Sequence, residues 1–266
     1  MKHREKLMWA LVLSVVVSAA RVRTVSAQTP AVQTVRGRVE VTSALNTSGI
    51  TPRAALAARA KIRHDNVPAT VVWLTAASGS DVQLDPPSPG PAANARLVQR
   101  NKSFEPRLLV VPAGSQVEFP NRDPFFHNVF SLFEGKRFDL GLYEAGTSRT
   151  VRFDRPGISY IFCNIHPEMN AVVITMSTPL YAIASGDGQL SIPNVPSGRY
   201  TLHIWSEGMG PENDKGVTRE ITIGENSASL GVIPVPEANG QRMAHKNKYG
   251  REYDQPAPDN SIYQQH

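Results

Sequence analysis

Cysteine is the scarcest residue of this chain, because Cys163 is the only one among 266 residues. A single cysteine excludes an internal disulfide, so packing and hydrogen bonds must hold the fold together. Long apolar runs are also lacking. The longest, residues 7–20, is shorter than the ~20 residues that a membrane-spanning helix needs. We therefore expect no transmembrane span in the mature chain.

The N-terminus has the composition of an export signal. Lys2, Arg4 and Lys6 precede the apolar residues 7–20, and the small residues Val25-Ser26-Ala27 offer a cleavage site. This pattern predicts a cleaved signal peptide at residues 1–27 and a periplasmic or secreted protein. An uncleaved N-terminal anchor is the alternative.

The mature chain also lacks an excess of positive charge. The formal net charge is +5, but residues 1–27 carry five of the 28 Lys and Arg and one of the 23 acidic residues. The remainder therefore has 23 basic and 22 acidic side chains. Because the basicity belongs mostly to the signal, we expect no nucleic-acid partner.

Short apolar runs alternate with Gly, Pro, Asn and Asp along the chain, which predicts an all-β protein. The expected strands include Leu108–Val111, Val117–Phe119, Thr150–Phe153, Ser159–Cys163 and Ala171–Met176. Four prolines within residues 85–93 indicate a stiff linker. The polar residues 237–266 are expected to form a disordered tail.

The residues around Cys163 have the chemistry of metal ligands. His166 and Met169 follow it at positions +3 and +6, and His127 lies upstream. A thiolate, two imidazoles and a thioether form the ligand set of a type 1 blue copper ion. Zinc prefers Cys and His without a thioether, so this set selects one copper ion. The residue types leave an alternative open, in which Cys163 and Met169 are inert core residues.

Spacing adds geometry to this chemistry. In a strand that ends at Cys163, Ile161 and Cys163 point to one face while Tyr160 and Phe162 point to the other. Only five residues separate Cys163 from Met169. A loop this short keeps its ligands near the thiol, but spacing alone does not bring His127 to them.

Residues 94–176 resemble the cupredoxins, the plastocyanin and amicyanin group of blue copper proteins. The resemblance rests on the C-x2-H-x2-M spacing, which is that of amicyanin, and on His127-Asn128-Val129 after Asn121-Arg122-Asp123. Two phenylalanines before His127 and an insertion at Phe133–Tyr143 depart from the family pattern.

This resemblance implies a Greek-key cupredoxin β-sandwich in which His127 meets Cys163, His166 and Met169. It also implies that Asn128 ties the two ligand loops together by hydrogen bonds. His166 would be the ligand nearest solvent, where an electron leaves through its ring edge.

The flanking residues 28–93 and 177–236 are similar to a carboxypeptidase-regulatory-like, transthyretin-type β-sandwich. The order of its later half is present in Tyr181–Ala184, Leu190–Ile192 and Tyr200–Trp205. Its first strands would lie before residue 94, so the cupredoxin segment would be inserted into a second small sandwich. The alternative is that Val35–Ala76 extends the copper domain.

Together these features predict an exported type 1 copper protein that carries single electrons between redox partners. A filled ligand set leaves no open position for substrate, so we expect a carrier with a redox partner protein and not an enzyme. Copper binding and delivery without a redox partner is a second hypothesis. A structural or adhesive β-sandwich protein with an accessory copper site is the third.

Overall fold

The computed structural model describes residues 32–42, 67–88, 95–132, 135–209, 216–224, 228–236 and 245–253. The predicted signal peptide lies outside these described residues, as do parts of the predicted linker and tail. Within the described ranges, the secondary structure is β-strand apart from one 3-10 turn, η2 (Glu207–Met209). The all-β prediction is confirmed. No helix in these ranges has the length and hydropathy that a membrane span requires.

The middle of the chain forms a five-stranded sheet, a two-stranded sheet and a hairpin. The five-stranded sheet has the order β5 (Leu108–Pro112), β11 (Asn170–Met176), β10 (Gly157–Cys163), β7 (His127–Ser131) and β8 (Phe138–Tyr143). The other pairs are β6 (Ser115–Pro120) with β9 (Ser148–Phe153) and β3 (Val98–Arg100) with β4 (Ser103–Glu105). The five strands expected from the sequence are all present, each longer by one to three residues.

Apolar side chains from the five-stranded sheet and from the β6–β9 sheet fill the core of this segment. Val117 and Phe119 of β6 and Phe153 of β9 are buried in one cluster with Ile161 and Cys163 of β10. The two sheets therefore pack face to face as a sandwich.

The other face of β10 is buried as well. Tyr160 and Phe162 belong to a separate apolar cluster, which confirms the alternation expected for this strand.

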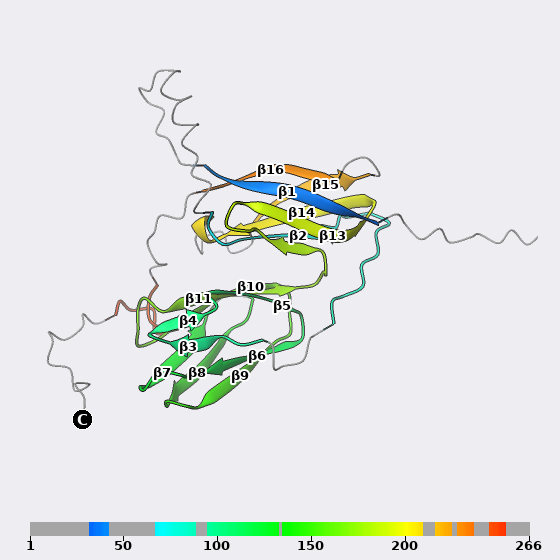
Figure 1. Cartoon of the computed structure of the whole chain (residues 1–266). Helices are drawn as coiled ribbons and strands as arrows, with labels where there is room; N and C mark the ends of the chain where they lie inside the picture. Colours follow the sequence, from blue (N-terminus) through cyan, green and yellow to red (C-terminus); the bar gives the residue numbers. More distant parts are fainter. Residues whose placement is uncertain are drawn as a thin grey trace, which may run out of the picture. The chain divides into compact units, whose positions relative to one another are not determined.

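Strands from the two ends of the chain form the remaining sheets. One has the order β12 (Tyr181–Ile183), β2 (Thr70–Ala76), β14 (Gly198–Ser206) and β15 (Val217–Ile223). The other has the order β13 (Gln189–Pro196), β1 (Val32–Thr42) and β16 (Ser229–Pro236), with β1 and β16 parallel and side by side (Figure 1). Strands that precede residue 94 thus pair with strands that follow residue 176. The division into domains and the transthyretin-type likeness remain predictions.

A third apolar cluster joins the β10–β11 face to the sheet of β2 and β14. It contains Tyr160 and Ile174 on one side and Val71 and Trp205 on the other. Trp205 Nε1 also donates a hydrogen bond to the Tyr160 hydroxyl at 3.2 Å. Because these groups are buried together, we expect the stability of residues 94–176 to depend on the flanking strands.

Residues 245–253 lie in the segment that was expected to be disordered. They have defined contacts, including hydrogen bonds from Lys248 to Asn164 and from Tyr253 to Cys163. These nine residues of the predicted tail therefore have defined contacts, while the division of the chain that includes the tail remains a prediction. Residues 237–244 and 254–266 lie outside the described part of the chain.

Candidate metal centre

Three ligand atoms converge at one end of the sandwich. The Cys163 Sγ lies 3.6 Å from His127 Nδ1 and 3.5 Å from His166 Nδ1. All three atoms lie within 4.8 Å of one another. Ligands held ~2.0 Å and ~2.3 Å from a common ion would themselves be ~3.5 Å apart at a tetrahedral angle, so one metal ion fits among them.

Strand pairing explains how residues 36 positions apart meet. Antiparallel β7 and β10 place Val129 opposite Cys163. His127 begins β7 two residues earlier, and Cys163 ends β10. Both side chains therefore reach the same end of the sheet from neighbouring strands.

The ligand loop after Cys163 is closed by its own backbone. Cys163 N–H donates to Met169 O at 3.1 Å, and Met169 N–H donates to His166 O at 3.0 Å. Asn164 N–H donates to Asn128 O at 2.8 Å, which joins this loop to the strand that carries His127. The short loop thus keeps His166 beside the thiol.

Met169 is fully buried and belongs to the same apolar cluster as Cys163 and Val129. Its carbonyl oxygen accepts a hydrogen bond from the Cys163 amide, so its backbone lies next to Cys163. Its role as the axial ligand remains a prediction.

Burial sets the protonation of the ligands in the metal-free chain. It lowers the pKa of His127, although Asp123 opposes the shift. It also lowers the pKa of His166 to about 4, with smaller contributions from the charges of His127 and Lys102. Burial raises the pKa of the Cys163 thiol, and the backbone N–H groups that hydrogen-bond to the sulfur reduce this shift. At neutral pH a metal would therefore displace only the thiol proton.

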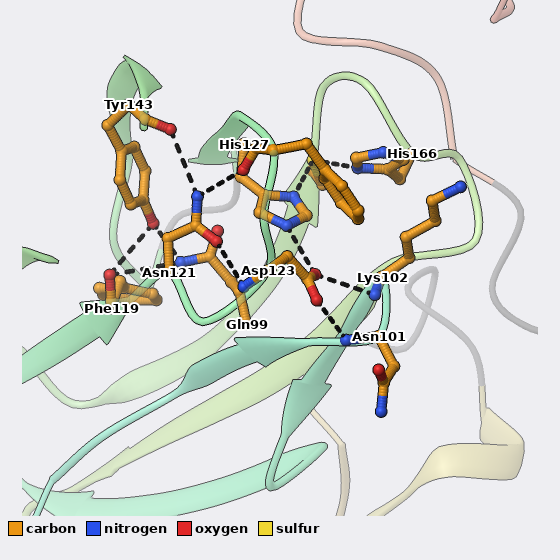
Figure 2. A network of polar contacts seen from close by, with 11 residues as sticks. Gln99, Asn101, Lys102, Phe119, Asn121, Asp123, His127, Tyr143 and His166 are labelled. Carbon is orange, nitrogen blue, oxygen red and sulfur yellow. Dashed lines mark hydrogen bonds and ion pairs between the residues drawn. The ribbon is translucent and has the colours of Figure 1, made fainter. Parts of the chain in front are cut away.

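Asp123 orients His127, a role that was not predicted. His127 Nε2 lies 2.9 Å from Asp123 Oδ2. A carboxylate only accepts, so Nε2 carries the hydrogen and Nδ1 is left with its lone pair toward Cys163. The same carboxylate accepts the backbone N–H of Asn101 at 2.6 Å and of Lys102 at 3.0 Å (Figure 2).

The β3–β4 turn supplies these two amides in an unusual conformation. Asn101 and Lys102 both have φ of 53°, a left-handed conformation that costs non-glycine residues about 1 kcal/mol or more. The hydrogen bonds to Asp123 offset this cost. The sequence contained the Asn121-Arg122-Asp123 motif, but nothing in it linked Asp123 to a turn more than twenty residues away.

Asn121 shapes the bend between β6 and β7. Its Oδ1 accepts the Asp123 amide at 3.0 Å, and its Nδ2 donates to Phe125 O at 2.8 Å. The bend is thereby fixed on both sides of residue 124, and this places Asp123 and His127 within hydrogen-bonding distance.

Asn128 contacts both ligand-bearing segments and the insertion. Its backbone oxygen accepts from Asn164, and its backbone N–H hydrogen-bonds the Cys163 sulfur. Its side-chain Nδ2 donates to Asp139 Oδ1 at 2.6 Å and to Gly141 O at 3.0 Å. The two ligand segments are joined through its backbone, while its side chain holds β8, the strand formed by the insertion.

The His166 side of the site is the more accessible one. His127 and Cys163 are buried, whereas His166 is only half-buried. The Phe125 ring lies 5.4 Å from both imidazole rings, and Ile165 next to His166 is exposed. Of the three converging residues, His166 is therefore the one closest to solvent.

Comparisons with known proteins find similarity in fold only. No protein-family model and no curated protein matches the chain. A purple cupredoxin from Nitrosopumilus maritimus is 23% identical over 31% of this chain and 100% of its own, with a TM-score of 0.29. A copper-containing nitrite reductase from Thermus scotoductus SA-01 is 24% identical over 36% of this chain and 27% of its own, with a TM-score of 0.30.

A Cu(I) form of an amicyanin mutant is 19% identical over 36% of this chain and 98% of its own, with a TM-score of 0.30. TM-scores this low carry no argument about function. The chemistry of the site therefore rests on the residues of this chain.

Proposed function

We propose that this chain holds one type 1 copper ion and carries single electrons. The observation that carries the proposal is the convergence of Cys163 Sγ with the Nδ1 atoms of His127 and His166. A thiolate with two imidazoles suits copper, and buried Met169 would supply the weak axial bond. Copper, when bound, supplies a one-electron change between Cu(I) and Cu(II).

The residues of the chain would perform three tasks in this function. Asp123 and the β7–β10 pairing hold the ligands in one arrangement, which suits both oxidation states because little must move. The buried walls exclude water from the thiolate. Half-buried His166 would pass the electron to a redox partner protein through its exposed edge.

We propose a carrier and not an enzyme, because four ligands from the chain would leave no position open for substrate.

Export to the periplasm or secretion, with a cleaved signal at residues 1–27, belongs to the same proposal. The proposal also includes a cupredoxin domain, residues 94–176, that is inserted into a second sandwich. The pairing of strands from both sides of residues 94–176 supports that insertion.

Copper delivery uses the same ligands, so retention of the metal separates the two functions. The copper-loaded protein is reduced and reoxidised repeatedly beside a Cu(I) chelator, and copper is measured in both fractions. We expect the protein to keep its copper through every cycle. Transfer of copper to the chelator at each reduction would instead indicate delivery.

A further inference from the structure

Residues 245–253 lie against the start of the ligand loop. The Tyr253 hydroxyl donates to the carbonyl oxygen of Cys163 at 2.8 Å. The backbone N–H of Lys248 donates to Asn164 Oδ1 at 2.9 Å. Both acceptors belong to the residues at which β10 ends and the loop begins. The segment is therefore attached to the metal centre itself.

An ion pair extends this attachment to the strand of His127. Lys248 Nζ lies 2.7 Å from Asp139 Oδ2, and the other oxygen of Asp139 accepts from Asn128 Nδ2. Asn128 directly follows His127 in β7. The segment thus contacts the supports of both ligand-bearing strands.

Aromatic packing fixes the segment in place. The His245 ring stacks on Phe162, with centroids 4.0 Å apart and planes at 24°. The Tyr253 oxygen lies 3.1 Å from His245 Nδ1. His245 Nδ1 also lies 3.1 Å from Lys246 O, and a carbonyl only accepts, so Nδ1 carries a hydrogen that faces both oxygens.

The segment is also organised internally. The amides of Tyr249 and Arg251 both donate to Asn247 Oδ1 at 3.0 Å. This turn brings His245 and Tyr253 together, so both contact β10 from one side. A closed turn with two attachment points can restrain a loop more strongly than a free chain end.

Metal exchange requires the ligand loop to open, since Cys163 and Met169 are fully buried. Local opening is governed by the contacts that close the region concerned. The contacts from Lys248 and Tyr253 add to those that the loop makes with its own backbone. They must break, or move with the loop, before the thiol is exposed.

We propose that residues 245–253 are a clamp on the metal centre, in which Tyr253 and Lys248 are positioning residues that slow copper exchange. The inference rests on the proposed copper binding and extends it to a second part of the chain. The clamp holds Cys163 and the first residue of the loop.

The test compares two identical chemical changes in the full chain. Tyr253→Phe removes the hydroxyl that reaches Cys163. The matched control, Tyr181→Phe, makes the same change on a half-buried ring of β12, in the sheet formed by the flanking strands. Amide hydrogen exchange of residues 164–169 is measured without metal, and copper release to a chelator is measured after loading. The absorption spectrum of the loaded protein shows whether the ligand set is unchanged.

We expect Tyr253→Phe to accelerate both amide exchange in the loop and copper release by roughly two- to tenfold. This is the rate change that corresponds to the net free energy of one hydrogen bond. Tyr181→Phe should match the wild type. The double variant Tyr253→Ala/Lys248→Ala should release copper faster still. Rates equal to the wild type in both Tyr253 variants would overturn the clamp alone. A wild-type chain that binds no copper would overturn the proposed function, and the claim about copper exchange with it.

Discussion

Replacing Asp123 with Asn is the sharpest test of how this site is held. Asp123 is only 5% exposed, and its two oxygens accept three hydrogen bonds. The donors are the amides of Asn101 and Lys102 and the Nε2–H of His127. Asparagine keeps the size of the side chain but has one acceptor oxygen. Either orientation of its amide turns an NH2 group toward at least one of these donors.

The size of the effect follows from that mismatch. One buried donor left without an acceptor costs about 1–3 kcal/mol, and the loss of the negative charge weakens the remaining bonds. We therefore expect Asp123→Asn to lower the free energy of unfolding of the metal-free protein by about 2–3 kcal/mol. For a chain of this size, that corresponds to a fall in melting temperature of about 4–10 °C. Copper affinity should fall about 10–100-fold, because the imidazole loses the group that orients it.

Thermal unfolding of the metal-free protein and copper titration against a competing chelator measure the two effects. Asp154→Asn is the control, since Asp154 is exposed and forms an ion pair with Lys136. It should leave both values unchanged. An Asp123→Asn protein with wild-type melting temperature and wild-type copper affinity would show that the carboxylate does not hold the ligand.

Three further outcomes follow from the same structure. Met169→Gln should retain copper and lower its reduction potential in voltammetry, because a harder oxygen ligand favours Cu(II); loss of copper would speak against an axial Met169. In the metal-free protein the pKa of His166 is lowered from 6.5 to about 4, so only the unfolded chain takes up this proton between those values. Stability should be full above pH 6.5 and should fall as the pH drops toward 4, and a flat profile of denaturation midpoints would contradict the shift. Trp205→Ala removes a buried ring and its bond to Tyr160, which should cost about 3–5 kcal/mol in urea denaturation; a change below about 1 kcal/mol would mean that the third apolar cluster contributes little.

Local signals in the sequence predicted much of this fold. The strands expected around Cys163 are present because their apolar runs are short and bounded by turn residues. The alternation of Tyr160 and Ile161 between two faces follows directly from the period of a strand. The proximity of His166 to Cys163 was predictable from the length of the loop, since only five residues lie between Cys163 and Met169.

Contacts between distant segments could not be predicted in this way. Asp123 receives two amides from a turn more than twenty residues earlier, and no local pattern marks such a pairing. Tyr253 reaches Cys163 across 90 residues from a segment whose polar composition indicated disorder. The sequence also did not reveal what covers the outer face of β10. Trp205, which packs there, belongs to a strand that begins after residue 176.

The visible absorption and electron paramagnetic resonance spectra of the oxidised, copper-loaded protein test the central claim most directly. A thiolate of Cys163 bonded to Cu(II) between two imidazoles should give one copper per chain, an intense blue colour and the spectrum of a type 1 site. Cys163→Ser should remove the colour, because a hydroxyl is a poor donor to copper. A wild-type protein that holds one copper per chain and stays colourless would contradict the account.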